Sequence, residues 1–560
     1  MEYERLVEVY KKLEQTTKRL EKTSIVSDLL SNTPESEIPM VIQLLEGRVF
    51  PEWDERKIGF SSKLVLRALA KIVGAEASEI EKKWSKTGDL GEVAEEMIKK
   101  KKQTTFFSSK LTIDKVTKNI RRLAEMTGEG AVDKKVSCVS ELLAAASPSE
   151  SRFIVRTVLE DLRVGIALGV IRDAIAQAYN KDVKDVENAF AITVDYGEVA
   201  KLAKQDKLHT VALKPGKPLN SMLAVIAESV EEAFEDFGKE IQCEQKLDGF
   251  RIQIHKDHGD IQLFTRRMEN VTKQFPDVVS VAKSNIRGKS YILDAEAVGY
   301  NRVKKRYLPF QSISQRIRRK YDINEIASKF PVEVDLFDIV FYNNKSLMNE
   351  PLRKRRELLE SIIKPEVGII RTTEKLVTSS MPEAKKFFNK SLACGNEGIM
   401  IKNLESVYRP GRYVGGWSKL KQILEPLDLV IVGAEYGTGK RAGALSSFVL
   451  ACREGKNLLE CGMVSTGVKE KEQESGVTYN ELTKILKPLI VSQSGRSVKI
   501  KPKIVVEVLY EEVQKSPTYA SGFALRFPRF NRLRTEEKKV NDANSIEDVK
   551  RIFNMQKRKI

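Results

Sequence analysis

The chain has 560 residues, of which 41% are hydrophobic and 31% are charged. That apolar share is sufficient for ordinary buried cores, so a wholly disordered chain is excluded. The formal net charge of +18 predicts a large polyanionic partner. At about 150 residues per domain, the length suggests three or four domains.

Several protein classes are excluded by local features. The longest apolar runs, such as residues 429–434, are far too short to span a bilayer. An anionic membrane surface would also fit the positive charge, but no amphipathic basic anchor stands out, so we expect no membrane association. The start, MEYERLVEVYKKLEQ, has the pattern of a charged amphipathic helix rather than a signal peptide. The cysteines are scattered without a CxxC pair, which disfavours structural zinc and predicts reduced thiols in a cytoplasmic protein. The three histidines lack triad or metal spacing, so we expect them to be structural or surface residues.

Three regions with different patterns follow one another. Residues 1–212 show apolar positions three or four apart, which predicts an all-α region. Residues 213–424 begin with a breaker cluster and contain alternating segments such as CEQKLDGFRIQIHK and YILDAEAVGY, which predict an α+β region with antiparallel sheets. Residues 425–560 carry short strands spaced for a small β-barrel, followed by a basic helical tail.

The sharpest local pattern is EQKLDGFR, residues 244–251. In it Lys246 ends one predicted strand, an Asp-Gly turn follows, and Arg251 starts the next strand. Alternation places Phe250 on one face of that strand and Arg251 on the other. The pattern alone also fits a hairpin with a surface lysine, because Asp-Gly turns are common.

This string resembles motif I of the covalent nucleotidyltransferases, the superfamily of DNA ligases, RNA ligases and messenger-RNA capping enzymes. Other segments resemble the remaining motifs in the family's order and spacing: FTRRMENVT (Ia), ILDAEAV (III), LFDIVFYN (IIIa), EGIMIK (IV), WSKLK (V) and ALRFPRFNRLR (VI). The resemblance covers essentially the whole chain. It is closest to the ATP-dependent DNA ligases of archaea and eukaryotes, and the archaeal replicative type fits the length.

The resemblance implies a multidomain fold: an all-α DNA-binding domain (1–212), an α+β adenylation (nucleotidyltransferase) domain (213–424), and an OB-fold β-barrel with a C-terminal helix (425–560). It also implies a monomeric enzyme that seals nicks in duplex DNA during replication, repair and recombination. Lys246 attacks the α-phosphate of ATP, and pyrophosphate leaves. The resulting lysyl-AMP passes its AMP to the 5′-phosphate at the nick, and attack by the 3′-hydroxyl releases AMP.

An amine attacks phosphorus only in its neutral form, so we expect burial and nearby cations around Lys246. The expected sources of positive charge are Arg251, Arg266, Lys419 and a bound metal. The resemblance assigns further nucleotide contacts to Glu244, Glu296, Phe337 and Arg412, with Phe337 as the platform for adenine. It also assigns site roles to Asp248, Lys402, Lys421, Arg526 and Arg529. Arg412 stands five positions before Trp417, one more than in the family's pattern.

Carboxylates in two motifs are the predicted metal ligands. In ILDAEAV, Asp294 and Glu296 alternate with apolar residues and therefore share one face. Paired oxygens suit Mg²⁺, although such a pair alone also fits a solvated strand face. The resemblance makes Glu296 the ribose and metal contact and Glu397 the second metal carboxylate.

The expected partners are nicked duplex DNA and a sliding clamp. The helical domain should grip DNA mainly through phosphates, and the glycines and alanines of LRVGIALG suit a minor-groove approach. A short QxxFF segment, Gln103 with Phe106 and Phe107, resembles the clamp-binding element of archaeal ligases. Internal packing of the two phenylalanines is the alternative.

Other functions remain open at this point. An RNA ligase or capping guanylyltransferase is disfavoured by the large helical region and by RFPRF. A non-catalytic nucleic-acid clamp is disfavoured by the intact Lys246, Glu296, Glu397 and Lys419. An NAD-dependent ligase is disfavoured because its cysteine cluster and helix-hairpin-helix tail are missing.

Overall fold

The computed structural model describes residues 1–557 except 55, 101–109, 239, 304, 309, 318, 320, 412–414, 423, 438–440, 442 and 471–475. Along these residues, no helix has both the length and the apolar composition needed to cross a bilayer. The chain folds into two compact units built from separate segments. The first unit comprises Met1–Val225, Gly249–Thr373 and Asn403–Trp417, and the second comprises Ile226–Asp248, Glu374–Lys402 and Ser418–Ile560.

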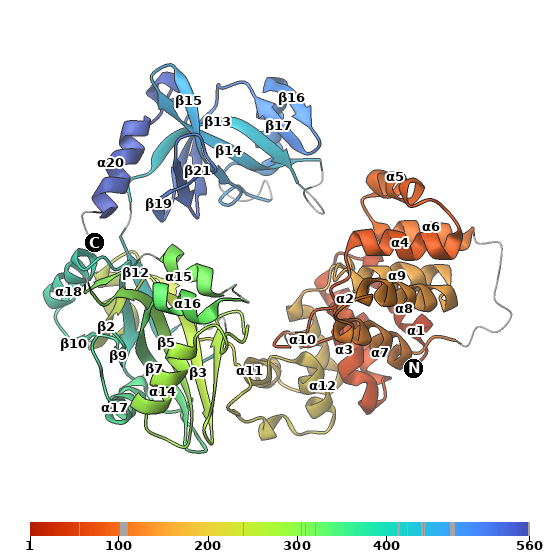
Figure 1. Ribbon diagram of the computed structural model, residues 1–560, viewed down its shortest axis with the longest axis horizontal. Helices are drawn as coiled ribbons and strands as arrows, with labels where there is room; N and C mark the ends of the chain where they lie inside the picture. Colours follow the sequence, from red (N-terminus) through yellow and green to blue (C-terminus); the bar gives the residue numbers. More distant parts are fainter. Residues whose placement is uncertain are drawn as a thin grey trace. The chain divides into compact units, whose positions relative to one another are not determined.

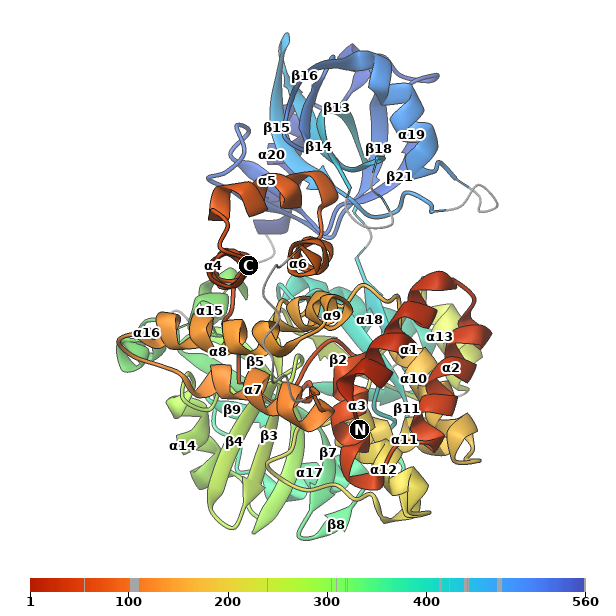
Figure 2. The same ribbon diagram turned by 90° about the vertical axis from the view of Figure 1, so that its right-hand side faces the viewer.

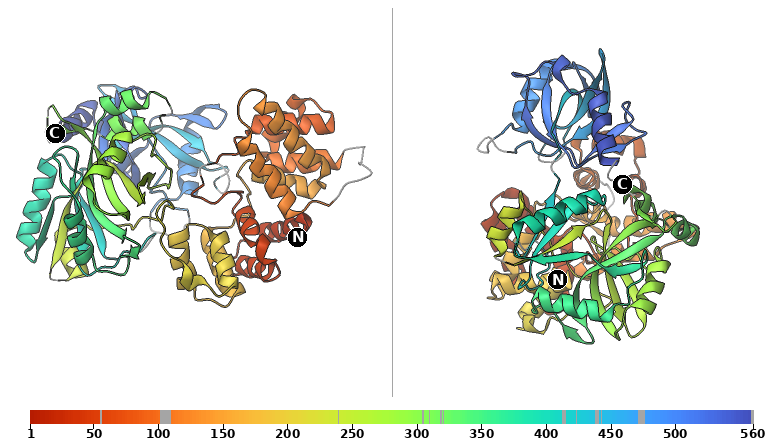
Figure 3. Two further views of the ribbon diagram at one scale, coloured as in Figure 1. Left: turned by 60° about the horizontal axis from the view of Figure 1, so that its bottom comes forward. Right: turned by 90° about the vertical axis from the view of Figure 1, so that its left-hand side faces the viewer.

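The N-terminal part of the first unit is helical, as the 3–4 spacing predicts (Figure 1). Its helices are α1 (Tyr3–Gln15), α2 (Arg19–Ser31), α3 (Ile38–Leu45), α4 (Ser62–Val73), α5 (Ala77–Thr87), α6 (Leu90–Lys99), α7 (Ile113–Glu125), α8 (Ala131–Ala145), α9 (Pro148–Val158), α10 (Leu168–Ala178), α11 (Val183–Thr193) and α12 (Tyr196–Lys204), with 3-10 turns η1 (Glu35–Glu37) and η2 (Leu208–Thr210). Helix α9 begins with a capping box between Ser147 and Glu150, which satisfies otherwise unpaired backbone N–H groups. Helix α10 packs against α2, and the two labels stand side by side in Figure 2. Figure 3 shows the helices of this part, coloured red to yellow, from two further sides.

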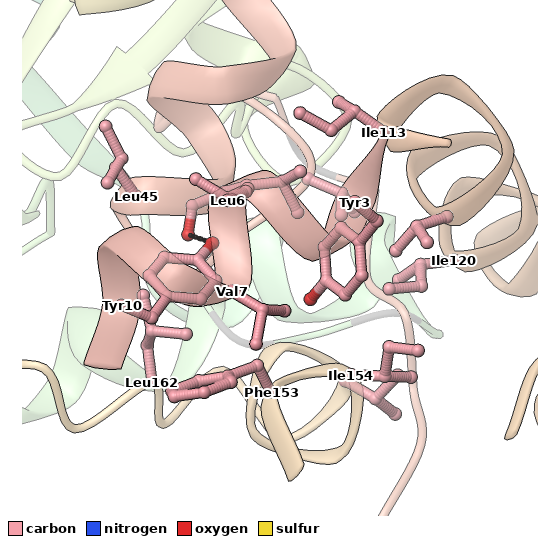
Figure 4. Close-up of a cluster of buried hydrophobic side chains, with 14 of the residues drawn as sticks. Tyr3, Leu6, Val7, Tyr10, Leu45, Ile113, Ile120, Phe153, Ile154 and Leu162 are labelled. Carbon is pink, nitrogen blue, oxygen red and sulfur yellow. Dashed lines mark hydrogen bonds between the residues drawn. The ribbon is translucent and has the colours of Figure 1, made fainter. Parts of the chain in front are cut away.

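The core of this helical part forms where apolar faces of distant helices meet (Figure 4). Tyr3 and Tyr10 of α1 are fully buried, and the ring centroid of Tyr10 lies 4.8 Å from that of Phe153 in α9. The Tyr10 hydroxyl donates a hydrogen bond of 2.9 Å to the carbonyl of Leu44. This bond offsets the cost of burying the hydroxyl.

The remainder of the first unit is built on a mostly antiparallel sheet with strand order β4-β3-β5-β7-β8 (Figure 2). Its strands are β3 (Phe250–Asp257), β4 (Asp260–Thr265), β5 (Ser290–Asn301), β6 (Arg306–Tyr307), β7 (Val332–Tyr342), β8 (Lys345–Ser346) and β9 (Ile370–Thr372). The accompanying helices are α14 (Pro276–Asn285), α15 (Phe310–Ile317), α16 (Ile323–Lys329) and α17 (Leu352–Ile362). Strand β6 pairs with β5, and β9 joins β7 in parallel.

The two faces of β3 divide as the alternation predicts. Phe250, Ile252 and Ile254 are buried in the apolar core beneath the sheet. On the opposite face, the segment after α12 is bound to the strand: the Gly216 N–H donates to Nδ1 of His255 at 3.1 Å, and the Gln253 amide donates to the Leu219 carbonyl at 3.0 Å. The polar face therefore anchors the chain that leaves the helical part.

The second unit contains a smaller sheet with strand order β1-β12-β11-β2-β10. These strands are β1 (Val225–Ile226), β2 (Ile241–Lys246), β10 (Lys375–Thr378), β11 (Gly398–Asn403) and β12 (Trp417–Lys421), packed with α13 (Val230–Phe237) and α18 (Met381–Ala393). Strands β2 and β3 therefore belong to different sheets. The Asp-Gly turn between Lys246 and Phe250 is a crossover between sheets, and the alternative of a hairpin at this turn is wrong.

The C-terminal part of the second unit is rich in strands, with α20 beside β19 (Figure 1). Its elements are β13 (Leu427–Tyr436), β14 (Leu445–Glu454), β15 (Asn457–Val464), β16 (Ile490–Ser494), β17 (Ser497–Ile500), β18 (Val505–Leu509), β19 (Glu512–Lys515), β20 (Phe523–Arg526), β21 (Arg529–Leu533), α19 (Tyr479–Leu486), α20 (Ile546–Lys557) and the 3-10 turns η4 (Lys487–Leu489) and η5 (Val540–Asp542). The long strand β13 pairs with β14, and its register with β14 has two irregularities. It also pairs with β18 through residues 427–430 and with β17 through residues 433–435, so successive parts of one strand serve different neighbours.

Candidate active site

Lys246 lies at the end of β2, and its ammonium group contacts a carboxylate. Its Nζ is 2.6 Å from Oε2 of Glu397, the residue before β11. The backbone fixes this pair, because the Glu397 N–H donates to the Lys246 carbonyl at 2.9 Å. A Cβ at Gly398 would lie 2.1 Å from the carbonyl oxygen of Leu420, so only glycine fits between β11 and β12. The structure thus brings motifs I and IV together.

Glu397 also contacts a second lysine. Nζ of Lys421 in β12 lies 3.1 Å from the same oxygen and 3.0 Å from the carboxylate of Glu511. Burial alone would raise the pKa of Glu397, but Lys246 and Lys421 lower it to about 2. The carboxylate is therefore ionised at neutral pH. Lys419 lies two residues before Lys421 in β12 and is half-buried.

The predicted site residues Glu244 and Lys402 form a buried ion pair. Nζ of Lys402 in β11 lies 2.7 Å from Glu244 in β2, and both side chains are at most 2% exposed. The other carboxylate oxygen of Glu244 accepts from the Gln242 amide at 2.6 Å. Because Glu244 and Lys246 alternate along β2, this pair lies on the same sheet face as Lys246.

The arginine of motif VI reaches motif I. Nη1 of Arg526, at the end of β20, lies 3.4 Å from Asp248 and 3.1 Å from Glu512. Burial opposes its charge, but these carboxylates and Glu397 raise the pKa of Arg526. Arg529, at the start of β21, is exposed. Sequence reasoning missed Glu511 and Glu512, which belong to no motif and are recognisable only by their contacts.

In the first unit, Arg251 is held by Asp294. Its Nη2 lies 2.7 Å from Oδ2 of Asp294, a side chain that is only 2% exposed. Burial opposes the guanidinium charge, but Asp294, Tyr408 and Glu296 raise the pKa of Arg251. Glu296 lies opposite Arg251 in the β3–β5 register and is half-buried. The two carboxylates that the sequence analysis pairs therefore have different surroundings. Asp294 is buried in an ion pair with an arginine, and Glu296 is the more exposed of the two.

Phe337 and Trp417 frame this arginine. Phe337 is the half-buried residue within an otherwise buried stretch of β7. The Arg251 guanidinium carbon lies 5.2 Å from the Phe337 ring centroid and 5.8 Å from that of Trp417. The two rings meet edge to face at 6.1 Å. A flat aromatic face beside a cation suits a nucleobase and its sugar.

The remaining residues discussed in the sequence analysis lie at the surface, in the interior or outside the described part of the chain. Arg266 lies in the exposed turn after β4. Arg412, Gln103, Phe106 and Phe107 lie outside the described residues. The expectation for the histidines is confirmed: His255 is buried, while His209 and His258 are exposed.

The LRVGIALG segment lies in the loop between α9 and α10, and its last two residues begin α10. Arg163 and Gly165 adopt φ values of +60° and +64°, and Gly165 and Ala167 are exposed. The buried Lys22 of α2 donates hydrogen bonds to the carbonyls of Val164 at 2.6 Å and Gly165 at 3.0 Å. The loop therefore presents backbone at the surface in a fixed shape.

Comparison with known proteins identifies the family. Residues 2–176 match the model for the DNA ligase N terminus, residues 221–421 the ATP dependent DNA ligase domain, and residues 441–537 the ATP dependent DNA ligase C terminal region. The chain is 43% identical to a DNA ligase of Nanoarchaeum equitans over 100% of this chain and 99% of that protein. The chain belongs to the ATP-dependent DNA ligase family. It is an enzyme that joins DNA strands at the expense of ATP, as the motifs predict.

Other archaeal ligases match over the same extent. Identity is 42% to the DNA ligase of Thermococcus onnurineus and 40% to that of Archaeoglobus fulgidus, each over 99% or more of both chains. A solved structure named Pmar-Lig_PreS3 matches the fold with a TM-score of 0.58 at 17% identity, covering 94% of this chain and 99% of that one. The order of helical, adenylation and strand-rich regions is confirmed.

Proposed function

We propose that Lys246 is the nucleophile of this DNA ligase. Its neutral amine attacks the α-phosphorus of ATP, an N–P bond forms, the bond to the β-phosphate oxygen breaks, and pyrophosphate leaves. The AMP then moves to the 5′-phosphate at a nick, which restores the lysine. Attack by the 3′-hydroxyl finally forms the phosphodiester and releases AMP. The motif order and the place of Lys246 at the end of β2 support this role.

The observation that carries the proposal is the shared counter-ion of Lys246 and Lys421. One carboxylate, Glu397, serves two ammonium groups at 2.6 and 3.1 Å. Its negative charge is divided between them, so it holds neither as firmly as a dedicated partner would. Lys421 places a second positive charge beside Lys246, at the same carboxylate oxygen. Lys402, Lys419 and Arg526 add further positive charge suited to a triphosphate.

We infer that adenine stacks on Phe337 and that Arg251 and Glu296 contact the nucleotide. The other proposed nucleotide contacts are Glu244, Arg266, Arg412 and Lys419, and Asp248, Lys402, Lys421, Arg526 and Arg529 complete the proposed site. The half-buried Phe337 ring beside Arg251 supports this assignment.

We infer that Mg²⁺ accompanies ATP, with Glu296 and Glu397 as its protein ligands. Magnesium is typically bound through one or two carboxylates and substrate phosphates. Glu397 fits this role because it is ionised and hard. Within the described part of the chain, no group of three or more His, Cys, Asp or Glu side chains is placed to hold a metal, so phosphate oxygens and water would complete the shell. When bound, the ion neutralises charge developing on the phosphates.

We infer that the substrate is a nick in duplex DNA, sealed in replication, repair and recombination in the cytoplasm by a monomer. Residues 1–212, 213–424 and 425–560 are the proposed DNA-binding, adenylation and OB-fold domains. The basic composition and the preformed loop before α10 support backbone contacts to DNA. The segment Gln103–Phe107 is the proposed sliding-clamp contact.

The test is covalent labelling. The full chain is incubated with α-labelled ATP or GTP and Mg²⁺, and the adduct is located by mass spectrometry. We expect AMP on Lys246, no adduct in Lys246→Ala, and normal labelling in Lys283→Ala, a change of an exposed lysine in α14. An adduct on another side chain, or none, overturns the proposal. Sealing of nicked DNA by pre-adenylated protein tests the later steps.

A further inference from the structure

Tyr408 is a buried tyrosine outside every motif. It lies between β11 and β12, where its N–H donates to the Met348 carbonyl at 2.8 Å. Its ring is 2% exposed and meets the Trp417 ring edge to face, with centroids 6.1 Å apart. The side chain is thus fixed at both its backbone and its ring, which determines where its hydroxyl points.

The Tyr408 hydroxyl makes hydrogen bonds to three different segments. It donates to Oδ2 of Asp294 in β5 at 2.6 Å, and it accepts from Nη2 of Arg251 in β3 at 3.2 Å and from the Met222 N–H at 3.1 Å. Burial is the main cause that raises the pKa of Tyr408 well above its ordinary value, and the negative charge of Asp294 is the second cause. The hydroxyl therefore stays protonated and remains a donor to Asp294.

The same groups also bind Arg251 directly. The guanidinium donates to Asp294 at 2.7 Å and to the Met222 carbonyl at 2.5 Å. The rings of Phe337 and Trp417 also lie beside the guanidinium. Tyr408 completes this ring of hydrogen bonds, because its hydroxyl contacts both Arg251 and the carboxylate paired with it.

We propose that Tyr408 is a positioning residue for the adenylation reaction, one that holds the guanidinium of Arg251 in a single orientation beside Phe337. This inference rests on the proposed nucleotide contact of Arg251. An arginine has several rotatable bonds, and fixing it before ATP arrives removes an entropic cost from binding. Removal of the hydroxyl takes one hydrogen-bond donor from the buried carboxylate of Asp294 and lets the guanidinium move.

The test compares two tyrosines that each lose a buried hydroxyl. Tyr408→Phe keeps the ring, and we expect the KM for ATP in lysyl-AMP formation to rise about tenfold, with a smaller effect on the maximal rate. Tyr291→Phe is the matched control: Tyr291 is fully buried in β5, and its hydroxyl donates only to the Ala282 carbonyl among the bonds described, at 3.0 Å. We expect it to lower the melting temperature without changing the KM.

A double variant tests whether Tyr408 acts through Arg251. In an Arg251→Lys background, adding Tyr408→Phe should raise the KM less than twofold further. An unchanged KM in Tyr408→Phe, an equal rise in Tyr291→Phe, or full additivity with Arg251→Lys overturns the inference. Failure of the proposed function gives a different result, because the wild type would then carry its AMP on another side chain or form no adduct, whatever Tyr408→Phe does.

Discussion

The ammonium group of Lys246 lies 2.6 Å from the carboxylate of Glu397, and Lys421 contacts the same oxygen. Glu397 is therefore the counter-ion of both lysines. It is also a proposed ligand of Mg²⁺. In Glu397→Gln, we expect the Mg²⁺ concentration that gives half-maximal lysyl-AMP formation to rise at least fivefold, because a neutral amide is a weaker ligand for Mg²⁺. Single-turnover labelling across a MgCl₂ series measures this shift.

The matched control for that series is Glu374→Gln. Glu374 pairs with Lys390 and Gln245 in the same unit. Its loss should leave the Mg²⁺ midpoint in place. An unchanged midpoint in Glu397→Gln would remove Glu397 from the metal site.

The buried pair of Glu244 and Lys402 gives a prediction about stability. Lys402→Met leaves the Glu244 carboxylate buried without its cation, which we expect to cost about 3–5 kcal/mol of unfolding free energy. Adding Glu244→Gln should recover part of that loss, because the uncompensated charge is gone. Urea denaturation of the wild type, single and double variants measures both effects. If Lys402 served only to contact ATP, stability without nucleotide would be the same in Lys402→Met and the wild type.

The sequence predicts the parts of the site that lie within a single strand. Alternation places Arg251 opposite Phe250, and the motifs mark Lys246 and Glu397. It cannot predict that β2 and β3 belong to different sheets, because an Asp-Gly turn has the same local chemistry in a hairpin and in a crossover. Tyr408 is likewise invisible in sequence, since its partners Arg251 and Asp294 are 157 and 114 residues away.

His255 makes stability depend on pH. Burial lowers its pKa to about 3, so its ring is neutral in the folded protein and accepts the Gly216 N–H. The unfolded chain takes up a proton near pH 6.5, whereas the folded chain does not until about pH 3. The contribution is therefore fully present above pH 6.5 and falls by up to about 1.4 kcal/mol per pH unit as the pH drops toward 3.

Paired denaturation curves at several pH values isolate this contribution. The difference in unfolding free energy between wild type and His255→Gln should shrink as the pH falls from 6.5, since glutamine does not titrate. His258→Gln changes an exposed histidine and serves as the control for a substitution at the surface. A pH-independent difference for His255→Gln would mean that His255 is protonated in the folded state as well.

The loop before α10 gives a prediction about DNA. Lys22→Met removes the buried ammonium that holds the carbonyls of Val164 and Gly165, so the loop should lose its fixed shape. We expect binding to nicked duplex DNA to weaken about tenfold, while lysyl-AMP formation stays unchanged because that step needs no DNA. Lys18→Met, at the start of the same helix, removes one exposed positive charge and should weaken binding about twofold at most. Fluorescence anisotropy at fixed salt measures the affinity of each variant for nicked DNA. Equal affinities of the two variants would show that Lys22 affects DNA binding through its charge and not through its hydrogen bonds to the loop.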